Sequence, residues 1–311
     1  MAFIKSKTTQ YSPFILKFLA WQEERFPLIN LVMAAIAYFM IKRIFFANEN
    51  RIDLQSLVGI LIFSSQFLIL RILDEHKDNA EDKVNHPERV IQLGWIKLDH
   101  LKWLGCGCIL LQVISMSLLS TFSWELWGIW AAMQFWTFLM AKEFFVGGWL
   151  KPNLSLYAFS HILVTPLIFI WMMKWISIDI PVTEFFNYPL ARNILLMTFF
   201  GGYCYELTRK TKGKDEEKES NPSYTAQMGV NAALLRVAFY HFIFFLEVNL
   251  CLSNTGKAPN WPWRAIPILI FVLILHSLFR FYKNPVAKNR ELNEKLSGLL
   301  LMVAYVMVAF C

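Results

Sequence analysis

The chain has 311 residues, of which 56% are hydrophobic and only 17% are charged, and its formal net charge is +7. A soluble globular protein carries about 25% charged residues, so this composition excludes an ordinary soluble domain and predicts a polytopic helical membrane protein. The positive charge does not indicate a nucleic-acid partner, because basic segments beside membrane spans face anionic lipid headgroups.

A helix needs roughly 20 mostly apolar residues to cross the hydrocarbon core of a membrane. By this criterion the sequence predicts an all-α fold with nine transmembrane helices. They lie near residues 28–46, 54–73, 102–122, 124–145, 156–176, 189–205, 229–250, 265–282 and 297–311. No short apolar segment with a small-residue cleavage site precedes the first span, which we therefore expect to act as the insertion signal.

Most of the 30 Lys and Arg residues lie in segments on the same side of the membrane as the N-terminus. Because basic loops stay in the cytoplasm, the sequence predicts a cytoplasmic N-terminus in a multi-pass protein of the cell (inner) membrane. No soluble domain interrupts the pattern, so we expect a single domain over residues 1–311, surrounded by membrane lipids. Its two long hydrophilic loops, 71–101 and 206–227, are both predicted to be cytosolic.

The first of these loops begins with the segment RILDEHKDNAEDKVNHPERV, residues 71–90. Its acids Glu75, Asp78 and Asp82 stand at helical spacing, and Asp74 precedes Asp78 by four residues. Residues three or four apart share a helix face, and several carboxylates on one face favour a hard cation such as Mg²⁺, which also bridges to phosphates. The competing interpretation is a solvated helix extension in which Lys77, Lys83 and Arg89 offset the acids.

The residues after the acids support the first interpretation. Asn85, Pro87 and Arg89 follow Asp82 at +3, +5 and +7. A proline ends a helix, so the chain would turn at Pro87 and allow Arg89 to fold back toward the acids.

This segment resembles the first signature of the UbiA superfamily of intramembrane prenyltransferases, NDxxDxxxD followed by NxPxRP. Asp74 stands at the Asn position, and Glu75, Asp78 and Asp82 stand at the three Asp positions. Asn85, Pro87 and Arg89 match the tail, whereas Val90 replaces the second proline. The resemblance extends to nine helices around a central cavity, a cytosolic N-terminus and acidic loops after helices two and six.

The resemblance implies that Asp74, Glu75, Asp78 and Asp82 hold Mg²⁺ and that Asn85 and Arg89 lie on the diphosphate side. The implied reaction is the ionisation of a polyprenyl diphosphate, followed by transfer of the prenyl group to an aromatic or lipid acceptor. Family members commonly carry a basic residue near the end of the fourth helix that reaches the diphosphate, and the resemblance assigns this role to Lys142. The neighbouring Glu143 is expected to form a salt bridge or a snorkelling pair.

The second motif departs from the DxxxD pattern of the family. The segment YCYELTRKTKGKDEEKE places Glu206 at the first acid, also as a metal ligand, but Lys210 at the second. One possibility is that Arg209 and Lys210 neutralise the diphosphate directly, a role that suits both side chains. The later acids, residues 215–217, are expected to belong to a solvated charged loop.

Polar residues inside spans are costly and therefore candidates for function. Arg236 could face the cavity or pair with an acid between helices, and the second interpretation is preferred. His161 is expected to be hydrogen-bonded between helices rather than to bind a metal.

Two other functions remain open on the sequence alone. A membrane terpene cyclase would use the same ionisation without an acceptor. A divalent-cation transporter would use the acids to select metal, but transport favours ligands near the middle of the membrane, whereas these acids gather at one face.

Overall fold

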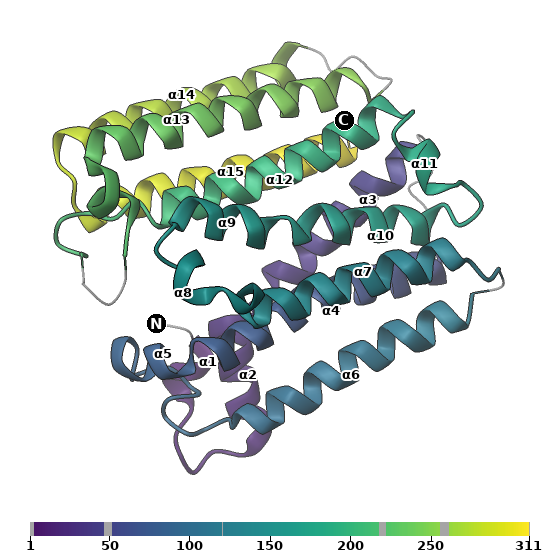
Figure 1. The fold of residues 1–311 in the computed structure, drawn as a ribbon, viewed down its shortest axis with the longest axis horizontal. Coiled ribbons are helices and arrows are strands. Elements are labelled where there is room, and N and C mark those ends of the chain that lie inside the picture. The colour runs from purple at the N-terminus through teal and green to yellow at the C-terminus, as the bar shows by residue number, and fades with distance from the viewer. Residues whose placement is uncertain (1–2, 47–51, 120, 218–221, 256–260, 311) are drawn as a thin grey trace. The chain divides into compact units, whose positions relative to one another are not determined.

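The computed structural model describes residues 3–46, 52–119, 121–217, 222–255 and 261–310, and this part of the chain is helical without a strand (Figure 1). The elements are α1 Phe3–Lys7, α2 Phe14–Arg25, α3 Ile29–Phe45, α4 Leu54–Lys77, α5 Asn79–Asn85, α6 Leu98–Ser117, α7 Trp124–Ala141, the 3₁₀ turn η1 Glu143–Phe145, α8 Gly147–Leu150, α9 Leu154–Ile162, α10 Val164–Ile176, α11 Val182–Phe185, α12 Pro189–Arg209, α13 Tyr224–Ser253, α14 Trp261–Lys283 and α15 Ala287–Phe310. Residues 218–221 of the second motif loop and Cys311, the end of the last expected span, lie outside the described residues.

Helices occupy every segment that the sequence predicts as a span, so the all-α fold is confirmed. By length and apolar composition, five helices of the described chain can cross a membrane: Leu54–Lys77, Leu154–Ile176, Tyr224–Ser253, Trp263–Lys283 and Ala287–Phe310. A sixth is added if α2 and α3, bent by 57°, count as one span. The protein is therefore an integral multi-pass membrane protein, while the count of nine spans and the central cavity stay predictions.

The chain forms two compact units, which are described separately. The first comprises Met1–Tyr38 and Arg51–Trp127, and the second comprises Phe39–Asn50 and Gly128–Cys311. The first acidic motif belongs to the first unit and the second motif to the second. The expected single domain over residues 1–311 stays a prediction.

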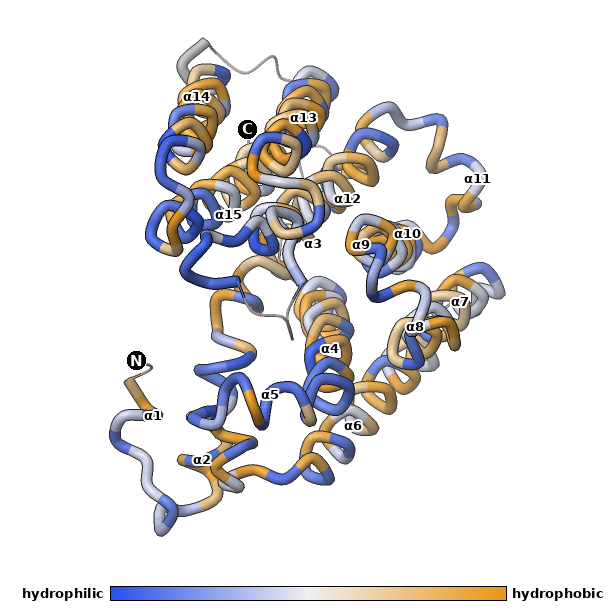
Figure 2. Tube along the Cα trace, turned by 60° about the vertical axis from the view of Figure 1, so that its left-hand side comes forward, coloured by the Kyte–Doolittle hydropathy of each residue, from blue (hydrophilic) through white to orange (hydrophobic). Residues whose placement is uncertain are grey.

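In the first unit, α4 packs along α6 within the apolar part of the chain. Gln112 of α6 donates from Nε2 to Ser65 Oγ at 2.9 Å and to Gln66 Oε1 at 3.2 Å on α4. Such contacts provide the hydrogen-bond partners that polar side chains need and that lipid tails cannot offer. Near the hydrophilic end of the unit, where Figure 2 colours α5 blue, α2 closes a small core against α4 and α6.

In the second unit, α12, α13, α14 and α15 pack side by side, with α9 and α10 against α12 (Figure 1). Buried polar pairs link three of these helices. His241 Nε2 of α13 lies 3.0 Å from Ser297 Oγ of α15, and Ser277 Oγ of α14 donates to Asn293 Oδ1 of α15. Backbone groups of Pro285 and Ala287, together with the Arg290 side chain in the first turn of α15, hold the second motif loop.

Candidate functional site

The core of the first unit determines which residues meet the first motif. Trp21 of α2 is buried against Ile72 of α4 and against Val90, which follows the motif and is completely buried. Arg25 stands one helical turn after Trp21, and Glu75 stands three residues after Ile72, so this packing brings the two charged side chains together. Val90 therefore serves as a core residue at the position where the family signature has its second proline.

Two carboxylates of the motif share one cation. Arg25 donates from Nε to the Glu75 carboxylate, and its Nη2 lies 3.9 Å from Asp82 Oδ2. Arg89 forms an ion pair with the same Asp82 oxygen, so the chain folds back after Pro87. Glu75 is 2% exposed and Asp82 8% exposed, so both carboxylates are buried beside their arginine partners.

The spacing of the acids predicts that the motif lies on one continuous helix. The structure instead divides the motif between two helices. Helix α4 ends at Lys77, Asp78 forms the junction with φ −92° and ψ 2°, and α5 begins at Asn79. Glu75 and Asp82 therefore reach the same arginine from two successive helices.

Asp74 is expected on the same face as the other acids, but the structure does not bring it to Glu75 and Asp82. Its side chain is 46% exposed and lies 3.9 Å from Arg71 Nη1 and 3.7 Å from Lys77 Nζ. Successive residues on a helix point about 100° apart, which separates Asp74 from Glu75. Asp74 thus belongs to a surface ion cluster in this structure.

Asp78 is half-buried at the junction between α4 and α5. Burial raises the pKa of its carboxyl above 3.8, and Lys77 beside it acts in the opposite direction. Asn85, the last residue of α5, is also half-buried. Asp78 and Asn85 flank Asp82 along the chain, one on either side.

The residues of the first motif fit Mg²⁺ in their chemistry. Carboxylate oxygens are the ligands that Mg²⁺ takes from proteins, and Glu75 and Asp82 already accommodate a shared positive charge from Arg25. No group of three acids, histidines or cysteines in the described chain is gathered closely enough to hold a metal as it stands. The ion would therefore need two protein carboxylates and its own waters, with Arg25 displaced from one of them.

In the second unit, Glu206 is neutralised by its own helix end. Arg209 Nη2 lies 2.7 Å from Glu206 Oε2, and Lys210 Nζ lies 3.1 Å from Oε1. Burial opposes the ionisation of Glu206, but the two cations outweigh it and hold its pKa at about 2. With Lys210 at the place of the second acid, this end of α12 presents two cations and one carboxylate, which suits an anion better than a second metal ion.

The acids of the loop after α12 lie in a solvated segment, as expected, with Asp215 and Glu217 exposed and Glu216 half-buried, but each of them also makes a specific contact. Asp215 Oδ1 accepts from the Ala287 amide at 2.8 Å, and Glu216 accepts from Arg290 Nε at 2.9 Å. Glu217 Oε1 accepts from Thr225 Oγ1 at 2.8 Å. These acids fasten the loop to the α14–α15 turn and to the start of α13.

Gly213 allows the same loop to approach the α14–α15 turn closely. A Cβ at this position would lie 2.5 Å from the carbonyl carbon of Val286 and 2.7 Å from the amide nitrogen of Ala287. The neighbouring Lys214 amide donates to the Pro285 carbonyl at 2.8 Å. Backbone meets backbone here, and no larger residue fits without moving one of the two segments.

Three further candidates belong to the second unit. Lys142 is exposed at the end of α7, and the adjacent Glu143 lies 3.1 Å from Lys151 Nζ. Arg236 donates to Ser155 Oγ of α9, so the expected partner, an acid on another helix, is wrong. His161 Nδ1 lies 2.8 Å from the Tyr157 carbonyl of its own helix, and the expected hydrogen bond between helices stays a prediction.

Two residues of interest carry no signal in the sequence. Arg25 precedes the first expected span among ordinary polar residues, and only the packing of α2 shows that it meets the motif. Tyr157 is one of 10 tyrosines, and its position beside Lys210 depends on how α9 lies against α12.

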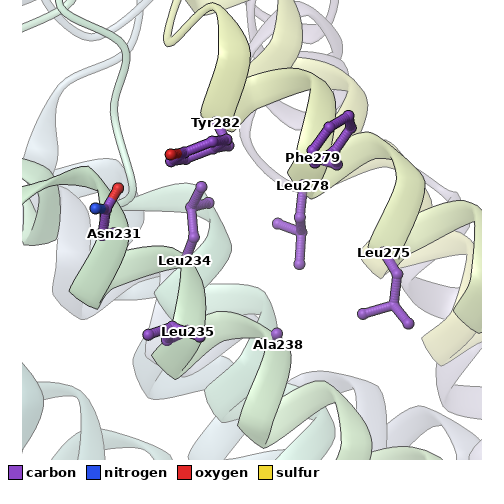
Figure 3. A pocket seen from close by; sticks show the side chains of 8 residues that line it. All are labelled: Asn231, Leu234, Leu235, Ala238, Leu275, Leu278, Phe279 and Tyr282. Atoms are coloured by element: carbon purple, nitrogen blue, oxygen red, sulfur yellow. The ribbon is translucent and has the colours of Figure 1, made fainter.

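The described chain also has an apolar groove of about 380 Å³ between α13 and α14 (Figure 3). Its lining is Asn231, Leu234, Leu235, Ala238, Leu275, Leu278, Phe279 and Tyr282. The lining contains no carboxylate and no basic residue, so the groove has the chemistry of a surface in contact with lipid tails and not that of a diphosphate site.

No protein-family profile matches the sequence, and no curated protein matches it. Two solved structures share its fold. A structure of a digeranylgeranylglyceryl phosphate synthase is similar over 95% of this chain and 97% of its own, with 16% identity and a TM-score of 0.62. The apo structure of a UbiA homologue from Aeropyrum pernix K1 is similar over 91% of this chain and 98% of its own, with 11% identity and a TM-score of 0.67. The chain therefore shares its fold with these two proteins, one of which is a UbiA homologue.

Proposed function

We propose that the protein is a Mg²⁺-dependent intramembrane prenyltransferase that moves a polyprenyl group from its diphosphate to an aromatic or lipid acceptor. The observation that carries the proposal is the pair Glu75 and Asp82, two buried carboxylates that share one cation at the end of the apolar helix α4. A prenyl diphosphate has the matching form, a highly charged head on an apolar chain. The UbiA-type fold supports the same function.

In this proposal the acidic residues hold Mg²⁺ and the basic residues contact the diphosphate directly. Bound to Glu75 and Asp82, with Asp78 beside them, Mg²⁺ would neutralise the departing diphosphate. Arg89 pairs with Asp82 and is therefore positioned to donate to a phosphate oxygen as well. Arg209 and Lys210 of the second unit offer further charge-assisted hydrogen bonds, which are stronger than neutral ones.

The apolar spans serve the second half of the reaction. When the diphosphate leaves with the electron pair of the C1–O bond, an allylic cation remains that water would capture. A site walled by apolar helices excludes water and strengthens every charge interaction inside it. The acceptor then attacks the cation and loses a proton, and the prenyl tail need not leave the membrane interior. The basic side chains favour a cytosolic location for the diphosphate, with the N-terminus on that side of the cell membrane.

Pyrophosphate release tests this function. Purified protein in lipid or detergent is supplied with prenyl diphosphates of increasing length, with Mg²⁺ or with a chelator, and with aromatic and lipid acceptors. Transfer predicts pyrophosphate release that requires Mg²⁺ and a prenylated product that requires an acceptor. A cyclic hydrocarbon formed without acceptor would identify a cyclase instead. Absence of pyrophosphate from every substrate, with cation flux in liposomes, would refute the enzyme and identify a transporter.

A further inference from the structure

The apolar groove between α13 and α14 has one polar end. Asn231 of α13 and Tyr282 of α14 lie at this end, with the Tyr282 hydroxyl turned toward Asn231, and the remaining lining is apolar (Figure 3). Both helices are long and apolar enough to cross a membrane. Tyr282 is the last residue but one of α14, which ends at Lys283. The polar end of the groove therefore lies where this span meets the lipid headgroups.

A lysine stands at the polar end of the groove. Lys283 Nζ lies 5.3 Å from the ring centroid of Phe279 and 5.9 Å from that of Tyr282, and both rings line the groove. The Lys283 side chain is exposed and forms no ion pair with another residue of the described chain. The ammonium group is thus placed at the rim of the groove, where it can meet a negatively charged ligand.

The groove opens on the outer surface of its helices and runs along them. Leu235 is 72% exposed and Phe279 is 55% exposed, so a molecule in the membrane can enter from the side. The lining extends over seven residues of α13, from Asn231 to Ala238. This is about 10 Å at the rise of an α-helix, roughly a third of the hydrocarbon core. The groove therefore has the length of the upper part of one lipid acyl chain.

We propose that this groove binds an anionic phospholipid, with one acyl chain between α13 and α14 and the phosphate beside Lys283. Lys283 supplies the positive charge, and the Tyr282 hydroxyl and the Asn231 amide supply hydrogen-bond donors. A zwitterionic lipid carries a cation next to its phosphate, which Lys283 would repel, so a headgroup of net negative charge fits better. A prenyl diphosphate has several negative charges, most of which a single lysine would leave unpaired.

The lipid site adjoins the turn that holds the second motif loop. The Pro285 carbonyl accepts from the Lys214 amide at 2.8 Å, and Asp215 Oδ1 accepts from the Ala287 amide at 2.8 Å. Lys283 precedes Pro285 by two residues, so a headgroup bound to Lys283 restrains the end of α14 from which this turn begins. Because a ligand stabilises the state that binds it, the anionic lipid should also stabilise the loop against local opening.

Native mass spectrometry of the detergent-purified protein tests the site. The wild type should bind phosphatidylglycerol about fivefold more tightly than phosphatidylcholine with the same acyl chains, the effect of one lysine near an anionic headgroup. Lys283→Gln should reduce this ratio to about one, and Ala238→Phe, which fills the groove, should weaken the binding of both lipids. The matched controls are Lys102→Gln, an exposed lysine near the start of α6, and Ala232→Phe, an exposed position of α13 outside the lining. Both should bind lipid as the wild type does.

Hydrogen exchange tests the connection to the loop. In the wild type, phosphatidylglycerol should slow exchange in the peptide that contains the Lys214 amide, and in Lys283→Gln it should not. Exchange that the lipid leaves unchanged in the wild type would refute the stabilisation of the loop.

Three results would overturn the lipid site. They are equal affinity of the wild type for both lipids, an unchanged preference in Lys283→Gln, and an uncharged polyprenol that binds as tightly as phosphatidylglycerol and is lost in Ala238→Phe. The last would identify the occupant as a prenyl chain. Should Ala238→Phe fail to fold, Lys283→Gln still decides, because its side chain is exposed. Neither measurement requires turnover, so each result stands apart from the fate of the proposed prenyltransferase.

Discussion

Arg25 donates from its Nε to the buried carboxylate of Glu75, fifty residues further along the chain. The contact joins the N-terminal helix α2 to the first acidic motif, and it supplies a positive charge where the proposed metal ion would bind. Arg25 is thus a built-in counter-ion of the motif and holds the Glu75 carboxylate in place.

Arg25→Leu should destabilise the protein by about 3 kcal/mol, because removal of one partner leaves the other charge buried and unpaired. Denaturant unfolding in detergent measures the loss. Arg25→Leu combined with Glu75→Gln should recover most of it, since no charge remains unpaired. A double variant as unstable as the single one would show that Arg25 acts by packing alone.

Mg²⁺ should raise the Tm of Arg25→Leu more than that of the wild type. The ion stabilises whatever state binds it, and without Arg25 it has no competitor for Glu75. Lys17→Leu removes a positive charge from the same helix and serves as the control, with an Mg²⁺ response equal to that of the wild type. An equal response in all three proteins would mean that the ion does not use Glu75.

Asp82→Asn should lower kcat about 10²- to 10³-fold, the usual effect of removing one electrostatic contact to a departing anion. Folding should survive, because the amide still accepts hydrogen bonds from Arg89. Glu81→Gln changes the neighbouring, exposed acid and should leave kcat within about twofold. Asp78→Asn should resemble Asp82→Asn, and activity retained by both variants would remove the metal role of the motif.

Lys210→Met should raise the KM for the prenyl diphosphate about tenfold or more, the effect of one lost charge-assisted hydrogen bond. The Mg²⁺ concentration for half-maximal rate should stay unchanged, since Lys210 lies at the second motif. Lys214→Met removes an exposed positive charge from the same loop and controls for general electrostatics. A lower KM in Lys210→Met would show that Lys210 is ordinary loop charge.

Glu206 gives a prediction about pH. Its pKa in the folded protein is about 2, below the usual 4.5, because Arg209 and Lys210 outweigh the effect of burial. The depressed pKa means that the ion pairs stabilise the fold fully above about pH 4.5 and lose their effect as the pH falls toward 2. The difference in unfolding free energy between wild type and Glu206→Gln, on the order of 1–2 kcal/mol for partly exposed partners, should therefore be constant at neutral pH and vanish in acid. A difference that instead grows on acidification would contradict this assignment.

Much of the fold could be predicted because long apolar segments identify membrane helices directly in the sequence. Each apolar segment of the expected length contains a helix, since lipid forces the backbone to satisfy its own hydrogen bonds. The first motif could be predicted for a similar reason, because its acids stand in a charged segment that directly follows an apolar one. The turn at Pro87 was equally readable, as a proline cannot continue a helix.

What could not be predicted depends on packing between distant segments. The break at Asp78 has no proline or glycine to indicate it. Arg25 meets Glu75 because Trp21, Ile72 and Val90 share a core, and no local pattern encodes that contact. The three left-handed residues at 143–145 contradict their own preferences, so sequence propensity would exclude them.

The close approach at Gly213 has a consequence for the search for related proteins. A side chain at that position would collide with the backbone of the α14–α15 turn, so inheritance of this loop requires inheritance of the glycine. Aspartate and glutamate can replace one another with the charge kept, whereas the position of Gly213 leaves no space for a side chain. A glycine seven positions after the last-turn Glu206 is therefore a more durable ancestral marker than the acids themselves, and it offers a way to find kin whose acidic motifs have drifted beyond recognition.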